Sequence, residues 1–177
     1  RASELISSFK QVAVDQTSEQ RRTFRLLELV NEILLTLHPT LKKTPFTVEV
    51  DVPEGLWLES YPGPLGQVLV NLINNALTHG FEGYDQGCIW INARAVDREW
   101  IELAFSDNGS GIPEENLQRI FDPFFTTRLG QGGSGLGLNI THNLVSGILG
   151  GSLSVSSVPG QGICFVLRLP LVAPGGQ

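Results

Sequence analysis

The sequence lacks methionine, has only two cysteines, and carries no excess of positive charge. Two cysteines, Cys88 and Cys164, are too few for a disulfide framework, and they lack the spacing of a zinc site. This excludes small domains held together by disulfides or by a structural zinc ion. Each cysteine lies in an apolar run typical of a strand, so we expect both thiols to be buried in the core. The net charge of -6 excludes a broad basic surface for nucleic acid or an anionic membrane, so any phosphate site must be local.

Long hydrophobic runs are also missing. No apolar stretch approaches the roughly 20 residues that cross a bilayer, and no signal-peptide pattern is present, so we expect a soluble domain. Because the chain begins at Arg1 and contains no methionine, we expect it to be part of a longer protein. The length of 177 residues and the apolar fraction of 41% suit one domain. We assign this domain to residues 22–172, preceded by a helix at 1–21 and followed by a tail at 173–177.

The N-terminal segment differs from the rest of the chain. Its apolar residues recur at helical spacing, which predicts one amphipathic helix with a narrow apolar stripe. The stripe consists of Leu5, Ile6, Phe9, Val12 and Ala13. Two interpretations stay open: the helix packs on its own domain, or it is the end of a longer helix whose partner lies outside this chain.

Hydrophobic periodicity predicts the remaining elements. The predicted helices cover residues 27–37, stopped by Pro39, then 64–76, opened by Pro64, and 138–149. The predicted strands cover residues 48–52, 56–58, 88–96, 100–105, 153–158 and 163–169. Helices and strands mix here without a regular βαβ alternation, which indicates an α+β fold in which one layer of helices packs on one sheet.

Glycine is concentrated in one region, since 12 of the 20 glycines lie between Gly109 and Gly162. Such a cluster is tolerated where the backbone turns sharply or approaches a ligand. Asp107 follows a predicted strand and is followed by a tight Gly109-x-Gly111 turn, so its carboxylate can reach the floor of a pocket. A buried carboxylate needs a partner, and the exocyclic amine of adenine would serve. The same turn is also compatible with a purely structural role.

A second glycine-rich stretch, residues 130–138, leads into a predicted helix. Free N–H groups and the helix dipole make such a helix start an anion site. The stretch is not a P-loop, because no Gly-Lys-Ser/Thr follows the glycines. It is not a dinucleotide-binding turn either, because no strand immediately precedes it.

Four polar residues, Gln67, Asn71, Asn75 and His79, are spaced four apart on one predicted helix. This spacing places them on a single face. An exposed amide face is one interpretation, although a surface helix usually carries Lys and Glu instead. The other is functional, because an amide oxygen suits a Mg²⁺ ion that phosphates already hold.

Five segments together resemble the conserved boxes of sensor histidine kinases, in the order of that family. They are the N box at Asn71–Ala76, the G1 box at Asp107–Gly111, the F box at Phe121–Thr127, the G2 box at Gly133–Leu138, and the closing strands at 150–155 and 160–165. The resemblance implies the Bergerat ATP-binding fold, a two-layer α/β sandwich shared with type II topoisomerase, Hsp90 and MutL ATPases. It also implies ATP and Mg²⁺ as cofactors.

The resemblance also implies roles for single residues. Asp107 would bind the adenine amine and Asn75 the Mg²⁺ ion. Asn71 would face the phosphates, and His79 would contact a phosphate. Arg128, where the family often has Lys, would bind the terminal phosphate with its bidentate guanidinium. The further implied contacts are Gly109, Gly111, Ile112, Phe121, Thr126, Thr127, Gly133, Ser134, Gly135, Leu136, Gly137, Leu138 and Ile163.

Two of these positions need comment. Ile163 stands where the family commonly has Thr, which removes one polar contact near the base, so we expect a slightly altered affinity. Residues 122–134 would form a mobile lid over ATP.

Asn71 stands where topoisomerase-type relatives carry the Glu that activates water. An amide cannot accept that proton, so the sequence favours phosphoryl transfer over hydrolysis.

The implied function is that of the catalytic domain of a two-component sensor histidine kinase. It would transfer the γ-phosphate of Mg-ATP to a histidine outside this chain, for relay to an aspartate of a response regulator. The helix at 1–21 would be the C-terminal end of the dimerisation and phosphotransfer domain. The intact kinase would be a homodimer with this domain in the cytoplasm, and a sensor region outside this chain could anchor it in the inner membrane. Without that domain we expect a mainly monomeric chain, because a helix of about 20 residues is marginal alone.

Two other functions fit the same motifs. One is a related Ser kinase of the anti-sigma type, which the N-terminal helix argues against. The other is a nucleotide-binding regulatory module without catalysis, which the intact Asn75, Asp107 and Arg128 argue against.

Overall fold

The computed structural model describes residues 20–123 and 137–175, which form two sheets and a layer of helices. Strands β1 (Arg22–Arg25) and β3 (Trp57–Ser60) form a two-stranded sheet. The main sheet has the order β2-β4-β5-β7-β6, with β2 at Phe46–Asp51, β4 at Gly87–Ala95, β5 at Trp100–Asp107, β7 at Ile163–Pro170 and β6 at Ser152–Ser157. Only β2 and β4 pair in parallel among these neighbours.

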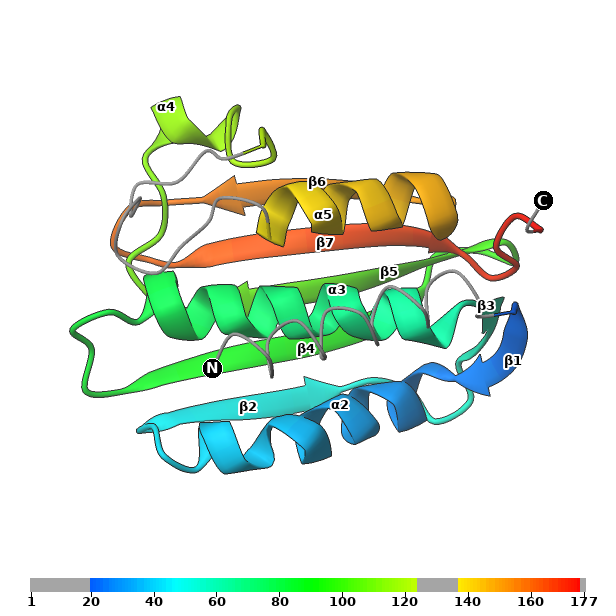
Figure 1. The fold of residues 1–177 in the computed structure, drawn as a ribbon, viewed down its shortest axis with the longest axis horizontal. Helices are drawn as coiled ribbons and strands as arrows, with labels where there is room; N and C mark the ends of the chain where they lie inside the picture. The colour runs from blue at the N-terminus through cyan, green and yellow to red at the C-terminus, as the bar shows by residue number, and fades with distance from the viewer. Residues whose placement is uncertain (1–19, 124–136, 176–177) are drawn as a thin grey trace, which may run out of the picture.

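The helices cover one face of this main sheet (Figure 1). They are α2 (Leu26–Leu41), α3 (Pro62–Asn75) with its π-helical continuation η1 (Ala76–Gly80), and α5 (Gly137–Asn143) with its π-helical continuation η2 (Leu144–Ile148). A short helix, α4 (Glu114–Leu117), lies outside this layer. The arrangement confirms the predicted two-layer α+β fold. In the described parts of the chain, no helix is both long and apolar enough to span a membrane.

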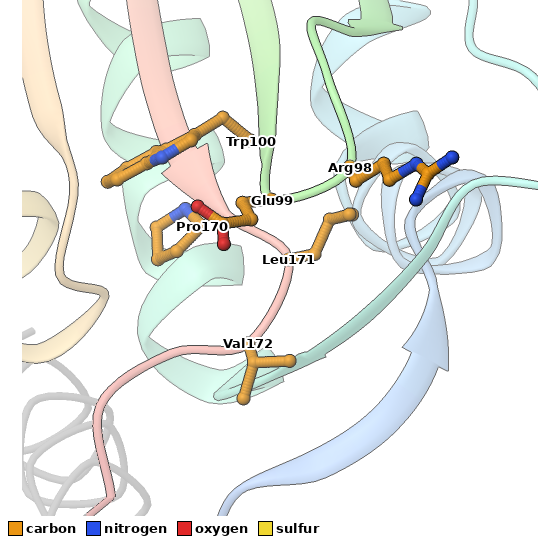
Figure 2. Close-up of a pocket in the computed structure, with 6 residues that line it drawn as sticks. All are labelled: Arg98, Glu99, Trp100, Pro170, Leu171 and Val172. Atoms are coloured by element: carbon orange, nitrogen blue, oxygen red, sulfur yellow. The ribbon is translucent and has the colours of Figure 1, made fainter.

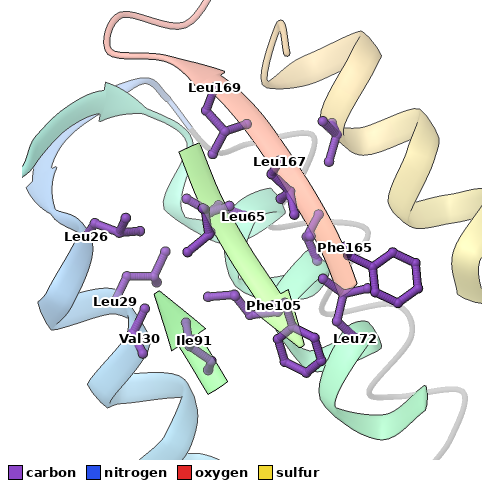
Figure 3. Packing of buried hydrophobic residues seen from close by; sticks show 14 of the residues in the cluster. Leu26, Leu29, Val30, Leu65, Leu72, Ile91, Phe105, Phe165, Leu167 and Leu169 are labelled. Atoms are coloured by element: carbon purple, nitrogen blue, oxygen red, sulfur yellow. The ribbon is translucent and has the colours of Figure 1, made fainter. Parts of the chain in front are cut away.

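The core lies between the helices and the inner face of the sheet (Figure 3). Strand β5 shows why: Ile101, Leu103 and Phe105 are fully buried, whereas the residues between them are only half-buried. Successive side chains of a strand point to opposite faces, so one face of each strand is apolar and meets the helices. Burying these large side chains contributes roughly 1.5–3 kcal/mol each.

Two predicted helix boundaries were wrong. Helix α2 continues through Pro39 to Leu41. Proline at this position removes only the hydrogen bond to the carbonyl of Leu35, and that residue is 77% exposed, so the carbonyl can turn to solvent. Helix α3 begins at Pro62 instead of Pro64, because proline is favoured wherever a first-turn N–H would have no partner.

Of the two cysteines predicted to be buried, Cys88 is buried and Cys164 is only half-buried. Cys88 and Cys164 both lie on the outer face of the sheet, which the helices do not cover. Cys88 is shielded there, with its Sγ 3.3 Å from a carboxylate oxygen of Glu49, while Cys164 is half-buried. Burial raises the pKa of both thiols. Their apolar neighbours in the sequence point to the opposite face, which a run of apolar residues alone does not reveal.

Both ends of the described chain are fixed to the same edge of the domain. Arg21 donates to the carbonyl of Ala173 at 2.6 Å and pairs with Glu59 at 3.1 Å. The hydroxyl of Tyr61 donates to the carbonyl of Pro174 at 2.7 Å, and Ala173 is 1% exposed. Residues 173 and 174 therefore pack with the domain, although we predicted a tail there. The predicted helix at 1–21 lies outside the described residues except for its last two positions.

Candidate functional site

Asp107 is the last residue of β5 and is only 5% exposed. Its Oδ1 accepts a hydrogen bond from the N–H of Gly109 at 2.8 Å. Burial raises the pKa of this carboxyl, against the opposing effect of backbone N–H groups of Gly109 and Ile163. A buried carboxylate with an incomplete set of donors is an acceptor held ready for a ligand amine.

The turn after Asp107 packs directly on the end of the α3–η1 helix. The N–H of Ser110 donates to the carbonyl of Gly80 at 2.8 Å, and a Cβ atom at Gly109 would overlap that same carbonyl. Gly111 has φ +73°, a conformation that residues with side chains rarely adopt. These contacts explain the Gly-x-Gly pattern, because both glycines are required by the backbone.

Asn71 links α3 to α5. Its Oδ1 accepts from Nε2 of Gln67 at 2.6 Å, and its Nδ2 donates to Oγ1 of Thr141 at 3.2 Å and more weakly to the carbonyl of Gly137 at 3.5 Å. The fully buried Thr141 donates its own hydroxyl to Gly137 at 2.8 Å. The Gly137 carbonyl can only accept, so the Thr141 hydroxyl must donate to it and accept from Asn71. The Asn71 oxygen must then accept from Gln67. The amide of Asn71 thus holds the start of α5 against the middle of α3.

Asn75 and His79 lie further along the same helix. Asn75 ends α3, is half-buried, and has no hydrogen-bond partner for its side chain among the described residues. The helix then becomes π-helical, with Phe81 N–H bonded to the carbonyl of Ala76. His79 lies within this π-helical turn, one α-helical turn's worth of residues after Asn75. The common face of Gln67, Asn71, Asn75 and His79 stays a prediction.

Phe121 packs between α5 and the sheet. Its ring centroid lies 5.2 Å from that of His142 and 6.5 Å from that of Phe165. Asn139 of α5 donates to the carbonyl of Phe121 at 3.0 Å. These contacts bring the end of the segment after α4 back to the first turn of α5, beside the bridge that Asn71 makes. The buried carboxylate, the amides of α3 and the start of α5 thus lie around the end of the same helix.

Residues 61–173 match the model of the histidine kinase-, DNA gyrase B- and HSP90-like ATPase family. The chain belongs to this family. Membership implies that the domain binds ATP, and it agrees with the resemblance seen in the sequence. The matched residues run from the start of α3 to the end of the described domain, so they include every box that the sequence suggested.

The named relatives are sensor kinases. The chain is 34% identical to the sensor histidine kinase RcsC of Escherichia coli over 94% of this chain and 18% of RcsC. It is 39% identical to the two-component sensor PprA of Pseudomonas aeruginosa over 72% of this chain and 14% of PprA. The chain therefore spans less than a fifth of the length of these relatives.

Solved histidine kinase structures have the same fold. The nucleotide-free catalytic domain of the histidine kinase ThkA superposes with a TM-score of 0.73 at 28% identity, covering 86% of this chain and 97% of that domain. The structure of ThkA in complex with the response regulator TrrA matches with a TM-score of 0.69 at 26% identity, over 95% of this chain and 48% of that one. This ATPase-family domain is therefore similar to sensor histidine kinases in sequence and to a histidine kinase catalytic domain in fold.

The structure brings together most of the predicted site residues of this ATPase-family domain. Asp107, Gly109, Gly111 and Ile163 lie at one end of the sheet, and Ile112 and Leu138 pack against the core. Gly137 begins α5. The remaining predicted contacts lie outside the described residues: Thr126, Thr127, Arg128, Gly133, Ser134, Gly135 and Leu136, with most of the predicted lid.

Two residues of the site were missed from the sequence. Thr141 is buried among apolar neighbours on α5, and Ser157 ends β6. A signal for Ser157 was available: it follows Leu153 and Val155 at a spacing of two, so it lies on the inner face of the sheet where a polar residue is unexpected. Thr141 also lies at helical spacing from Leu138 and Val145, but its partner Asn71 is 70 residues away and no local pattern identifies it.

A pocket at the opposite end of the sheet does not belong to this site (Figure 2). It is lined by Arg98, Glu99, Trp100, Pro170, Leu171 and Val172. Trp100 begins β5 and Asp107 ends it, so the two sites are about 23 Å apart at roughly 3.3 Å per residue.

Proposed function

We propose that this chain is the catalytic domain of a sensor histidine kinase, which transfers the γ-phosphate of Mg-ATP to a histidine outside the chain. The observation that carries the proposal is the buried carboxylate of Asp107 at the end of β5, in a chain whose relatives are sensor kinases. A buried acceptor at this place suits the exocyclic amine of adenine, since a lone buried carboxylate is costly without a partner.

The magnesium site we propose uses the side-chain oxygen of Asn75. The described residues contain no group of three His, Cys, Asp or Glu that could hold a metal by themselves. A single amide oxygen suits Mg²⁺, which usually keeps waters and takes its other ligands from nucleotide phosphates. The half-buried amide of Asn75, unpartnered among the described residues, fits that requirement. His79 would contact phosphate nearby, and Arg128 would bind the terminal phosphate.

Asn71 supports transfer over hydrolysis. Both ends of its amide are bonded, to Gln67 on one side and to Thr141 on the other. An amide has no basic site that could take a proton from water. ATP would therefore be held for transfer to another molecule, and positioning supplies most of the rate of such a reaction.

The phosphoacceptor must come from outside the chain. The sequence has three histidines: His38 is exposed near the end of α2, His79 belongs to the proposed phosphate site, and His142 packs beside Phe121. Each lies on a helix of this domain, so we expect none of them to reach the in-line position, where the attacking atom must lie about 3–3.5 Å from phosphorus.

The partners follow from this proposal. They are the kinase's own dimerisation and phosphotransfer domain, which residues 1–21 would end, and the receiver domain of a response regulator. The solved complex of the similar kinase ThkA with a response regulator supports the second partner. The intact kinase would be a homodimer with this domain in the cytoplasm, and the isolated chain would be mainly monomeric.

Radiolabelled ATP tests the proposal. The chain alone should show negligible self-labelling. Addition of the kinase's own dimerisation and phosphotransfer domain, the helix pair that carries the acceptor histidine, should produce acid-labile, base-stable label on that helix pair. Label of this chemistry on the chain alone would show that His38, His79 or His142 is an acceptor. Absence of label on the added helix pair, with ATP binding intact, would contradict the kinase assignment.

A further inference from the structure

Ser157 joins the turn after Asp107 to the hairpin between β6 and β7. Its hydroxyl oxygen accepts a hydrogen bond from the N–H of Ile112 at 2.8 Å. The same hydroxyl donates to the carbonyl of Gly162 at 2.7 Å. A single side chain therefore satisfies one backbone donor and one backbone acceptor from segments about 50 residues apart in the sequence.

The strand register places Ser157 in line with the base end of the site. Ser157 pairs with Ile163 across β6 and β7, and Ile163 pairs with Asp107 across β7 and β5. Directly opposed residues of neighbouring strands project from the same face. Ser157, Ile163 and Asp107 thus form one row across three strands, on the face that the helices cover.

The backbone around this row is closely packed. A Cβ atom at Gly162 would overlap the carbonyl of Asp107, and a Cβ atom at Gly111 would approach Oγ of Ser157 to 2.8 Å. The N–H of Gly160 also donates to the carbonyl of Ser110 at 2.7 Å. The turn after Asp107 therefore packs against the β6–β7 hairpin, and the hydroxyl of Ser157 bonds both segments.

We propose that Ser157 is a positioning residue for the nucleobase, acting by fixing the turn after Asp107 so that its carboxylate stays aimed at the exocyclic amine of adenine. This inference rests on the proposed nucleotide site. Ser157 acts through the backbone of Ile112 and Gly162 and needs no contact with the nucleotide. Loss of the hydroxyl leaves one backbone N–H and one carbonyl without this partner, and the turn gains freedom where the base is recognised.

The matched control is Ser156, the preceding residue of the same strand. It is exposed on the outer face of the sheet, in the row with Cys164 and Ser106. Ser157→Ala and Ser156→Ala therefore delete the same hydroxyl from adjacent positions on opposite faces. Affinities for Mg-ATP and Mg-ITP would be measured by displacement of a fluorescent ADP analogue, since ITP carries an oxygen in place of the exocyclic amine.

We expect Ser157→Ala to weaken Mg-ATP about 5- to 20-fold, the scale of leaving a hydrogen-bonding group unsatisfied. Mg-ITP should weaken less than about twofold, so the preference for ATP falls, and Ser156→Ala should match the wild type for both. A Ser157→Ala protein that binds ATP like the wild type, or that loses ATP and ITP affinity equally, overturns the inference. A merely structural role gives the second result. A wild-type protein that binds neither nucleotide contradicts the proposed function itself and this inference with it.

Discussion

The proposed nucleobase end and the proposed phosphate end of the site are built in different ways. At the nucleobase end, backbone meets backbone: the turn after Asp107 packs on Gly80 and on Gly162 so closely that a Cβ atom would overlap a carbonyl group. At the phosphate end, α3 and α5 are joined through side chains, in hydrogen bonds of 3.2 and 3.5 Å from Asn71. Backbone contacts tolerate no substitution, whereas a side-chain bridge can be changed one group at a time. Variants at the two ends should therefore differ in cost.

The largest expected effect is at the nucleobase end, in Gly162→Ala. Gly162 has φ +94° and Gly160 has φ +83°, so alanine strains the backbone at either position. Only at Gly162 does the new Cβ atom also meet backbone, that of Asp107; at Gly160 it meets nothing within 4 Å. We expect Gly160→Ala to lower the free energy of unfolding by about 1 kcal/mol, and Gly162→Ala by about 3 kcal/mol.

Urea denaturation of the two variants checks this difference. Equal losses would show that strain alone matters and that the close packing of β7 against Asp107 is not required. The comparison between the ends would then lose its physical basis.

A smaller effect is expected at the phosphate end, in Thr141→Val. Thr141 and Thr36 both donate their hydroxyl to the carbonyl four residues earlier, but Thr141 is fully buried and also accepts from Asn71, whereas Thr36 is exposed. Valine keeps the shape of threonine and removes the hydroxyl. We expect Thr141→Val to cost about 1–3 kcal/mol, because Asn71 loses a buried partner, and Thr36→Val less than about 0.5 kcal/mol.

Thermal melting of both variants in the nucleotide-free state measures this pair. If Thr36→Val lowered the melting temperature as much as Thr141→Val, the bridge from Asn71 would contribute nothing beyond an ordinary helix back-bond.

Much of this architecture follows from local patterns in the sequence. The two-residue period of β5 predicts its buried face, and the Gly109-x-Gly111 pattern predicts a turn that the backbone contacts explain. What the sequence does not reveal depends on pairing between distant segments. Asn71 was expected to face the phosphates, and its bonds to Thr141 depend on how α5 packs on α3. Its role in phosphate binding remains a prediction.

The same limit applies to the sheet. The apolar surroundings of Cys164 suggested burial, but the face on which a strand residue lies depends on the register of its neighbours. For Ser157, the alternation of the strand predicts its face, because it lies two residues after the apolar Val155. Its bonds to Ile112 and Gly162 could not be predicted in this way. Pro39 predicts the end of its helix because proline removes a helical hydrogen bond, and only the structure shows that the carbonyl released, that of Leu35, belongs to an exposed residue.

Asp107→Asn separates stability from nucleotide binding. Burial raises the pKa of Asp107, so the folded protein holds this proton to a higher pH than the unfolded chain does. The stability that the carboxyl contributes is therefore present below its unfolded pKa and is lost as pH rises through its folded pKa. Asparagine avoids this loss and can keep the bond from Gly109. We expect the nucleotide-free variant to melt no lower than the wild type at neutral pH, an advantage that disappears in acid.

Calorimetric titration of Mg-ATP into the wild type and Asp107→Asn tests the central claim most directly. The wild type should bind Mg-ATP. The variant, though folded, should bind it more weakly by about 1–3 kcal/mol, because the amide oxygen keeps the bond from Gly109 and its NH₂ group then meets the adenine amine, donor against donor. Equal affinities for the two proteins would contradict the assignment of Asp107 to the nucleobase and, with it, this account of the site.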